Sequence, residues 1–188
     1  MPKIAEVEKT PNPNSMKFIL RDPLTWGLAH SYDSADEARG DALAEAIFEI
    51  DHVSSVFYVD HWITVTQDGH AEWSSLLKKV AVPIREAPAA EEQSAGYSTA
   101  GSSLLEDESL SPADREKLVA ISELLDERIR PFLQGDGGDL FIVGLKGNTL
   151  EVHYQGACGS CPSSMSGTLS GIESLVRQID PNLEVVPV

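Results

Sequence analysis

The sequence predicts an α+β protein of two small mixed domains joined by a flexible acidic linker. Segments that alternate apolar and polar residues, as strands do, lie between segments with the 3.6-residue period of helices. An acidic stretch without a single basic residue, 89–111, separates residues 1–88 from residues 112–188. A chain of 188 residues has room for two domains of this size. We therefore expect one domain at 1–88 and a second at 112–188.

The acidic stretch "AAEEQSAGYSTAGSSLLEDESLS" is rich in Ala, Ser, Gly and Glu and contains five acidic residues. Such a composition is typical of a flexible, self-repelling linker. The alternative is a long surface loop within one domain. Structureless loops of this length are uncommon inside compact domains, so we favour the linker.

The N-terminal domain is expected to follow the order ββαββα. Ser34 and Glu37 form a capping box, which predicts that a helix begins there. Pro83 predicts a break or kink in the last helix. The expected elements are strands at 3–9 and 15–21 around the turn "TPNPN", a helix at 35–50, strands at 54–60 and 62–68, and a helix at 71–86.

The C-terminal domain is expected to follow the order αββαβ. Ser111 is a natural N-cap, and Pro112 suits the first position of a helix. The turn "KGN" joins two strand-like runs into a hairpin. The expected elements are a helix at 111–132, strands at 139–145 and 149–155, a helix at 162–179 and a strand at 183–188.

The charge of the chain argues against several classes of partner. The net charge is −16, divided as −6, −5 and −5 among the first domain, the linker and the second domain. Such a field repels phosphate backbones, so we expect no nucleic-acid partner. No apolar run approaches the roughly 18 residues of a membrane helix, so we expect no membrane partner. The first 15 residues lack the features of a signal or transit peptide, which predicts a cytoplasmic protein with reduced thiols.

Both cysteines of the chain, Cys158 and Cys161, lie in "GACGSCPSSM", between a predicted strand and a predicted helix. Pro162 suits the first helical position, which places Cys161 near the N-cap and Cys158 just before it. The positive end of a helix favours thiolates, and thiolates bind metals and attack disulfides. No bulky side chain is expected to cover these sulfurs, so we expect an exposed site.

The residues alone leave several kinds of site open. Structural zinc and iron–sulfur clusters commonly take four ligands, and this chain has two thiols. His153 is predicted to point away from the face of Leu150, Val152 and Tyr154, so we do not expect it to be a ligand. A complete four-thiolate site therefore needs two chains, and a two-fold dimer supplies them. The alternatives are a thiol–disulfide oxidoreductase using the same pair, a structural zinc-bridged dimer, and two unreactive cysteines.

A second motif, "GDGGDL" at 135–140, has a local interpretation. Its glycines, Gly135, Gly137 and Gly138, permit positive φ and are expected to end the first helix and start a strand. Asp136 and Asp139 are expected to accept hydrogen bonds from nearby N–H groups. The motif either forms only this turn or lies beside the cysteine loop and shapes it.

Together, "GDGGDL" and "YQGACGSCPSSMSGTL" at 154–169 resemble the NifU C-terminal domain of Nfu-type iron–sulfur proteins. The segment "TPNPNSMKFIL" at 10–20 resembles the N-terminal domain of the same proteins. The resemblance covers nearly the whole chain on both sides of the linker. One departure is Gly159, where the family usually has serine; both cysteines remain in place.

This resemblance implies a carrier that is not an enzyme and has no catalytic residue. Nfu proteins hold a 4Fe–4S cluster between two subunits and deliver it to apo-proteins. Carried over by the motif, Cys158 and Cys161 are the cluster ligands, and a 2Fe–2S cluster is also possible. The expected partners are apo iron–sulfur client proteins, a cluster donor and, in the loaded state, a second copy of the chain. The N-terminal domain, which has no cysteine, is expected to recognise partner proteins.

Overall fold

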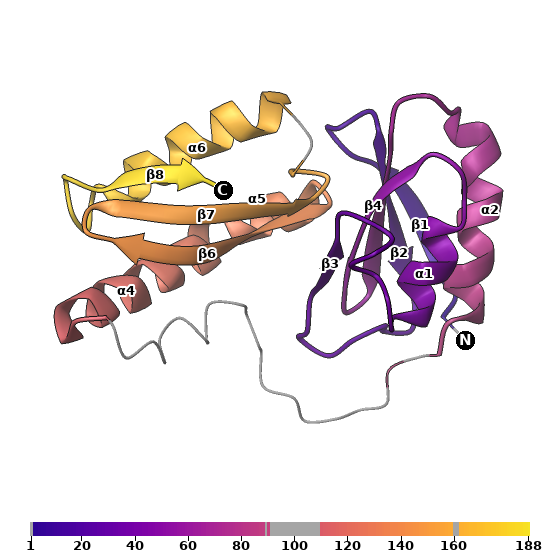
Figure 1. Ribbon diagram of the computed structural model, residues 1–188, viewed down its shortest axis with the longest axis horizontal. Helices are drawn as coiled ribbons and strands as arrows, with labels where there is room; N and C mark the ends of the chain where they lie inside the picture. Colours follow the sequence, from indigo (N-terminus) through magenta and orange to yellow (C-terminus); the bar gives the residue numbers. More distant parts are fainter. Residues whose placement is uncertain (1, 89, 91–109, 160–161) are drawn as a thin grey trace. The chain divides into compact units, whose positions relative to one another are not determined.

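The structure is a computed structural model that describes residues 2–88, 90, 110–159 and 162–188, with the side chains of 162–166 excluded (Figure 1). The chain divides into two compact units, Met1–Tyr97 and Ser98–Val188. Both units mix helices and strands, which confirms the predicted α+β class. Most of the predicted linker lies outside the described residues, so its bounds and flexibility stay predictions.

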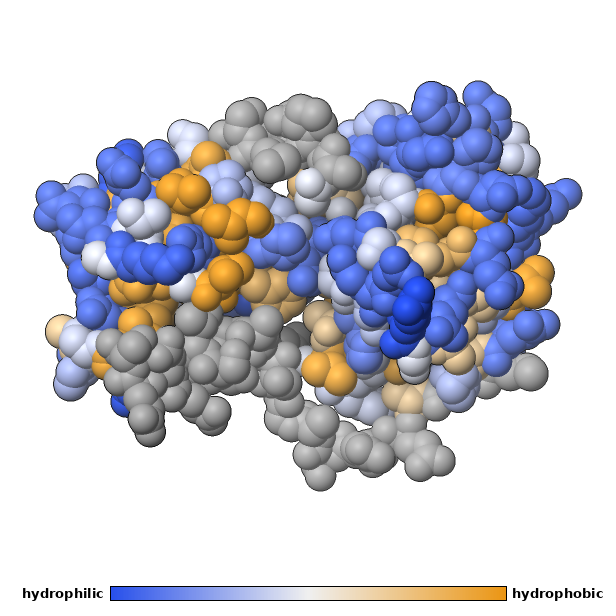
Figure 2. Space-filling view, in the orientation of Figure 1, coloured by the Kyte–Doolittle hydropathy of each residue, from blue (hydrophilic) through white to orange (hydrophobic). Residues whose placement is uncertain are grey.

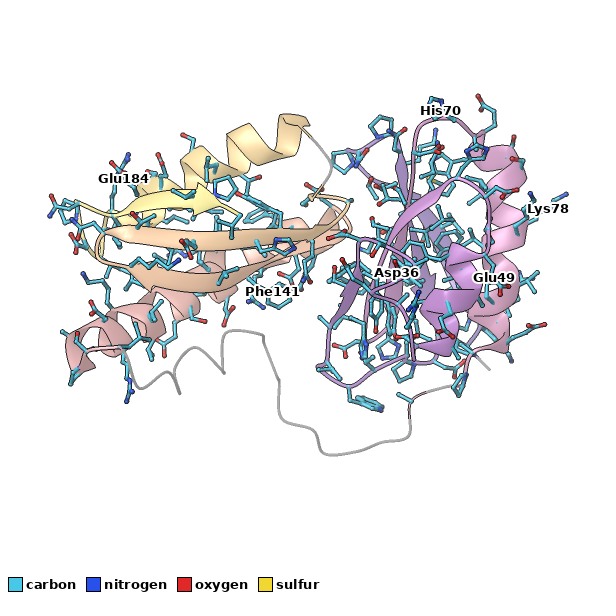
Figure 3. The ribbon with its side chains drawn as sticks, viewed as in Figure 1. Asp36, Glu49, His70, Lys78, Phe141 and Glu184 are labelled. Carbon is cyan, nitrogen blue, oxygen red and sulfur yellow. The ribbon has the colours of Figure 1, made fainter. Side chains whose placement is uncertain are left out.

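The N-terminal unit is an antiparallel sheet with two helices packed on one face (Figure 1). Within residues 2–88 the sheet has five strands in the order β1-β2-β5-β4-β3. Lys78, on the outer side of the second helix, projects away from the sheet (Figure 3). The elements are β1 (Ile4–Lys9), β2 (Ser15–Leu20), β3 (His30–Tyr32), α1 (Ala42–Phe48), β4 (Val53–Val59), β5 (Trp62–Gln67) and α2 (Trp73–Glu86).

The core of this unit lies between the sheet and the two helices. Strand residues of alternating positions meet the apolar stripes of α1 and α2, as the periodicities require. Each buried Val, Leu, Ile or Phe side chain stabilises the fold by about 1.5–3 kcal/mol relative to an exposed one. The largest fully buried members of this cluster are Phe18, Ile47, Val56, Ile63 and Ile84.

The predicted order ββαββα missed one strand. β3 contains three residues and pairs antiparallel with β4, His30 facing Tyr58. Its sequence, His-Ser-Tyr, is too short and too polar to show the alternation by which strands are recognised. The strand forms by pairing with the edge of β4. This pairing is a tertiary interaction, so the local sequence does not indicate it.

The first helix begins later than predicted. Ser34 Oγ does accept a hydrogen bond from Glu37 N–H (3.4 Å), and Glu37 Oε2 accepts one from Asp33 N–H (2.9 Å). These bonds close a turn only, because Gly40 has a φ of +95° and ends any helical path. The α-helix starts after Asp41, whose Oδ1 accepts from the N–H groups of Leu43 (3.1 Å) and Ala44 (3.0 Å).

Pro83 does not break the last helix, so the expected break was wrong, and the expected kink stays a prediction. α2 runs from Trp73 to Glu86 with Pro83 inside it. A proline within a helix removes one hydrogen bond from the turn before it. Only one turn follows Pro83, and its carbonyl still accepts from Ala87 N–H at 3.0 Å. The burial of Val80 and Ile84 on the sheet holds this last turn in place.

The C-terminal unit is a sheet covered by helices on one face, in the predicted order αββαβ (Figure 1). In residues 110–159 and 162–188 the sheet has the order β6-β7-β8. β6 and β7 form an antiparallel hairpin, and β8 lies parallel to β7 after a helical crossover. The elements are α4 (Pro112–Arg128), α5 (Arg130–Gly135), β6 (Gly138–Lys146), β7 (Thr149–Gly156), α6 (Pro162–Val176) and β8 (Glu184–Pro187).

The first helix of this unit is split, whereas the sequence predicted a single helix at 111–132. α4 ends at Arg128, and α5 begins at Arg130 with Pro131 in its first turn. Pro131 cannot donate to the carbonyl one turn earlier, so the helix is interrupted there. The predicted start was correct, because Ser111 Oγ accepts from Asp114 N–H at 3.1 Å and Pro112 follows.

Charged and polar residues dominate much of the visible surface, with apolar residues between them (Figure 2). Among the described residues, no helix combines the length and apolar character needed to cross a bilayer.

A polar network around Asp41 ties the N-terminal unit together. Asp41 Oδ2 accepts hydrogen bonds from the hydroxyls of Tyr32 (2.8 Å) and Tyr58. The His30 ring stacks on Tyr58, with centroids 4.7 Å apart. Burial by itself would raise the pKa of Asp41, but the hydrogen bonds from Ala44 N–H and the two tyrosines outweigh it and lower that pKa. One carboxylate therefore joins β3, β4 and the start of α1.

We predict that Asp41→Ala lowers the free energy of unfolding of the N-terminal unit by about 2–4 kcal/mol. The variant loses a helix N-cap, worth about 1 kcal/mol, and two hydrogen bonds to a charged group, worth about 1.5 kcal/mol or more each before relaxation. Tryptophan fluorescence of the full chain measures this unit alone, since Trp26, Trp62 and Trp73 all lie in it.

The matched control is Asp36→Ala, because Asp36 is exposed and pairs only with the exposed Arg39. It should leave the unfolding midpoint unchanged. Because folding lowers the pKa of Asp41 below its ordinary value of 3.8, the carboxylate stabilises the folded state at pH values above 3.8. This stabilisation is lost as the pH falls further. Equal midpoints for Asp41→Ala and Asp36→Ala at pH 7 would contradict the network.

Candidate functional site

The cysteine loop joins the end of β7 to the start of α6. β7 ends at Gly156 and α6 begins at Pro162, which confirms the predicted strand–loop–helix arrangement and the place of Pro162. The loop bends in a turn in which Gly159 N–H donates to Gly156 O at 3.2 Å. Cys158 is described, whereas Cys161 lies outside the described residues. The start of a 15-residue helix carries free N–H groups and partial positive charge, which favours thiolate.

The Cys158 side chain is not exposed, so that expectation was wrong for this residue. Cys158 is 1% exposed and belongs to the apolar core of the C-terminal unit. Its neighbours in that core include Leu140 on β6 and Tyr154 on β7. The sequence suggested exposure because the loop contains no large residue. The structure shows instead that a small loop lets its own cysteine fold back against the sheet.

The "GDGGDL" motif lies directly beside the cysteine loop. α5 ends at Gly135 and β6 begins at Gly138, as predicted, and Gly137 between them has a φ of +82°. Gly137 O accepts a hydrogen bond from Ala157 N–H at 3.0 Å. The residue before Cys158 is therefore anchored to this turn, which is what the site-shaping alternative requires.

Gly138 makes the closest approach to the cysteine sulfur. A Cβ built on Gly138 would lie 2.6 Å from Cys158 Sγ and 2.6 Å from Gln155 O. Real Cβ atoms essentially never come that close to other heavy atoms. The sulfur therefore occupies space that any other residue at 138 would fill.

Asp139 is buried beneath this turn and fixes it. Its Oδ1 accepts from Leu140 N–H at 2.7 Å, as predicted for a local N–H, and its Oδ2 accepts from Gln134 Nε2 at 3.2 Å. Arg130 Nη1 lies 3.9 Å from the same carboxylate, and Arg130 Nε lies 2.8 Å from Asp126. Burial raises the pKa of Asp139 although Arg130 acts in the opposite direction. The ion pairs thus connect α4, α5 and β6 behind the site.

Arg130 also contacts a second side chain of β6. Its guanidinium carbon lies 5.4 Å from the ring centroid of Phe141 on β6. A guanidinium over an aromatic ring is attracted by the ring's electron-rich face. Arg130 therefore holds the strand that carries Gly138 as well as the carboxylate of Asp139.

Tyr154 brings a polar group to the sulfur that sequence reasoning missed. Its hydroxyl is buried and has no hydrogen-bond partner among the residues that the structure describes. Burial, and next the nearby Cys158, raise the pKa of Tyr154 to about 12. The alternating pattern of β7 placed Tyr154 in the core, but nothing in that pattern indicated a sulfur beside it.

His153 lies where it was predicted, on the opposite face of β7 from Leu150, Val152 and Tyr154. Its Nδ1 is 2.7 Å from Val188 O. Among the described residues, no group of three or more His, Cys, Asp or Glu is placed to hold a metal ion. A metal site built on Cys158 would therefore need ligands from outside the described residues, such as Cys161 or a second chain.

The fold and the cysteine loop together define a class of protein: a two-domain α+β chain whose second domain presents a C-x-x-C loop at a strand–helix junction. Family models match both parts. Residues 4–91 match "Scaffold protein Nfu/NifU N terminal", and residues 121–186 match "NifU-like domain". Together these matches span about four fifths of the chain. The chain belongs to the Nfu family, as the sequence motifs indicated.

Similar proteins are found in fruit flies. The chain is 34% identical over 184 residues to "NFU1 iron-sulfur cluster scaffold homolog, mitochondrial" of Drosophila ananassae, and 32% identical to the protein of that name in Drosophila sechellia. The alignments cover 96% of this chain and 62–63% of those proteins, so the chain spans about three fifths of their length.

Solved structures match one part of the chain at a time. One is a Staphylococcus aureus protein, 29% identical with a TM-score of 0.39, covering 44% of this chain and 98% of its own. Another is a NifU-like protein from Saccharomyces cerevisiae, 22% identical with a TM-score of 0.41, covering 47% of this chain and 84% of its own.

The expectation of a cytoplasmic location was wrong. The fruit-fly relatives carry names that place them in mitochondria. The expectation rested on the composition of the first 15 residues. The matched part of those relatives is only about three fifths of their length, so that stretch says nothing about where such proteins reside.

We predict that Tyr154→Phe stabilises the C-terminal unit in the cluster-free protein. A buried hydroxyl without a partner costs about 1–3 kcal/mol, and phenylalanine keeps the ring while removing that cost. The free energy of unfolding should rise by about 1 kcal/mol, measured by calorimetry of the full chain. Tyr58→Phe is the opposite case, since its hydroxyl donates to Asp41, and it should destabilise the N-terminal unit. A lower stability for Tyr154→Phe would show that its hydroxyl has a partner.

Proposed function

We propose that this protein carries a 4Fe–4S cluster between the C-x-x-C loops of two chains and delivers it to apo-proteins. One observation supports this most strongly. The only two cysteines of the chain lie at a strand–helix junction inside the domain that matches the NifU-like model. The names of the relatives, which describe iron–sulfur cluster scaffolds, point to the same general role.

The number of ligands requires a second chain. A 4Fe–4S cluster is commonly held by four thiolates, and this chain supplies two, from Cys158 and Cys161. A two-fold axis through the cluster brings two identical loops together, so that each chain gives one pair. Because the described part of the chain contains no other ligand cluster, nothing there competes with this arrangement.

The helix that follows the loop offsets part of the charge. Four thiolates and an iron–sulfur core carry net negative charge, and the C-terminal domain itself has a net charge of −5. The N-terminus of α6, at Pro162, is the positive end of a helix macrodipole of about half an elementary charge. Two such helices, one from each chain, would face the cluster and lower the cost of gathering this charge.

Delivery follows from sharing the ligands between chains. Each thiolate of a client protein replaces one thiolate of the carrier on iron, so the number of iron–sulfur bonds is conserved and no electron is transferred. A contact between two chains that opens releases two of the four ligands together. The protein then acts as a carrier without catalytic turnover, and the cluster is its cargo.

The N-terminal unit is proposed to recognise partner proteins. It has its own core, its own polar network around Asp41 and no cysteine, so it cannot bind the cluster through sulfur. A separate unit with a separate core can bind a client or donor while the C-terminal unit exchanges ligands. The acidic linker, residues 89–111, is proposed to give the cluster-bearing unit its reach.

The competing function is thiol–disulfide exchange by the same cysteine pair. Reactive thiols of that class are accessible to their substrates. The burial of Cys158 does not favour such a role. An oxidoreductase would also reduce protein disulfides catalytically and would need no iron, so the same preparations distinguish the two functions.

We predict that Cys158→Ala and Cys161→Ala each abolish cluster binding. Anaerobic reconstitution of the unmodified chain with iron and sulfide should give about two irons and two sulfides per chain, because two chains share four of each. Each variant leaves only half of the ligands in the dimer and should fall to background in iron content and in visible absorption. Gly171→Ala is the control, since a Cβ there meets no atom within 4 Å. A stoichiometric cluster in either cysteine variant would refute the shared site.

We also predict that deletion of residues 1–88 spares cluster binding but slows delivery. The C-terminal unit keeps its complete core without the N-terminal unit. Transfer to several apo-proteins is followed by the recovery of their activity, at equal amounts of loaded carrier. Unchanged transfer rates for all clients after the deletion would contradict a recognition role.

A further inference from the structure

The position of Cys158 conflicts with the simplest picture of a shared cluster. A ligand that two chains share must reach the contact between them. In this structure the Cys158 side chain is 1% exposed and packs in the core with Leu140, Tyr154 and Ile172. The cluster-free chain therefore holds this sulfur inward.

The inward position depends on the absence of a side chain at residue 138. A Cβ on Gly138 would lie 2.6 Å from Cys158 Sγ and 2.9 Å from Cys158 Cβ. Gly138 pairs with Gly156 across the hairpin, so the backbone beside the sulfur belongs to the regular sheet and cannot easily withdraw. Gly144, on the same strand, is different, because a Cβ there would meet only Glu151 Oε2, the end of a flexible side chain, at 3.2 Å.

We propose that Gly138 forms a niche that holds the Cys158 thiol in a protected inward position when no cluster is bound, and that loading moves this sulfur outward. The niche consists of the Gly138 backbone and the Cys158 neighbours Leu140 and Tyr154. This inference rests on the proposed function, since it concerns one of the two proposed ligands. Gly138 acts on the cluster only through Cys158, so it is a positioning residue.

The loop has the means to make this movement. Gly156 and Gly159 stand on either side of Cys158, and Ala157 N–H donates to Gly137 O in the turn that precedes β6. Glycines near both ends of a short segment can absorb the change in backbone direction when the side chain leaves the core. The gain is chemical protection, because oxidation and alkylation of a thiol increase with its exposure.

The test measures the reactivity of Cys158 alone in the cluster-free full-length protein. A Cys161→Ser background leaves one thiol, and its alkylation by iodoacetamide is followed by mass spectrometry. We expect Cys158 to react at least about tenfold more slowly than in the same chain unfolded in guanidinium chloride, because a buried thiol reacts only when the fold opens. In Gly138→Ala the rate should rise by about tenfold or more, because a methyl group in filled space displaces the sulfur.

Two control variants separate the niche from general effects. Gly144→Ala makes the same chemical change on the same strand away from the sulfur and should leave the rate unchanged. Leu125→Ala, at a residue of α4 that is 2% exposed, weakens the same core at a residue that is not one of the niche residues. Gly138→Ala should exceed Leu125→Ala in alkylation rate at equal thermal stability, which an effect of unfolding alone cannot produce.

The outcomes are distinct. The proposal is overturned if Cys158 of the folded chain is alkylated as fast as in the unfolded chain. It is also overturned if Cys158 is alkylated no faster in Gly138→Ala than in Gly144→Ala. It is also overturned if Leu125→Ala accelerates alkylation as much as Gly138→Ala does at matched stability. Failure of the proposed function is seen separately, as a lack of iron uptake by the unmodified chain, and it does not alter the alkylation rates.

Discussion

The proposed cluster needs four thiolates, and each chain has two cysteines. The position of the proposed site and its dependence on a second chain both follow from this difference. It places the site where two copies can meet, at the loop between β7 and α6, and it makes the bound state depend on association. It is also consistent with the proposal that a small domain with two cysteines acts as a carrier. In the proposed site the cluster would be held only while two chains associate, so separation of the chains would release it.

The structure around the loop provides a rigid support for this arrangement. The β6–β7 hairpin and the turn at Gly137 hold Ala157 and Cys158, while Asp139 and Arg130 join the neighbouring helices to the same strand. The hairpin and these ion pairs can keep their geometry while the glycine-rich loop allows one sulfur to change position. The N-terminal unit has a separate core among the residues that the structure describes.

Local chemistry allowed much of the fold to be predicted from the sequence. Ser111 and Pro112 set the start of α4, Pro162 set the start of α6, and alternation in β7 separated His153 from the core. The errors arose where distant parts of the chain decide the outcome. β3 is one such case, since it pairs with the edge of β4. The late start of α1 also has a local cause, the positive φ of Gly40, although two tyrosines from other strands converge on the capping residue Asp41.

The site was predicted in part for the same reason. The spacing of Cys158 and Cys161 and the following proline pointed to the loop, since these features are local. The burial of Cys158 could not be predicted, because it depends on Gly138, twenty residues earlier in the chain, having no side chain. The glycines of "GDGGDL" were a signal, but they fitted a simple turn equally well. Tyr154 gave no signal, because a tyrosine in an apolar pattern is ordinary.

The most direct test of the shared cluster is the mass of the loaded protein under non-denaturing conditions. The chain is reconstituted without oxygen, and its intact assemblies are weighed by native mass spectrometry. We expect one species of two chains with four irons and four sulfides, and we expect loss of the cluster to accompany dissociation into cluster-free single chains. A single chain that holds a complete cluster, or a dimer that keeps its mass after the cluster is removed, would contradict the central claim.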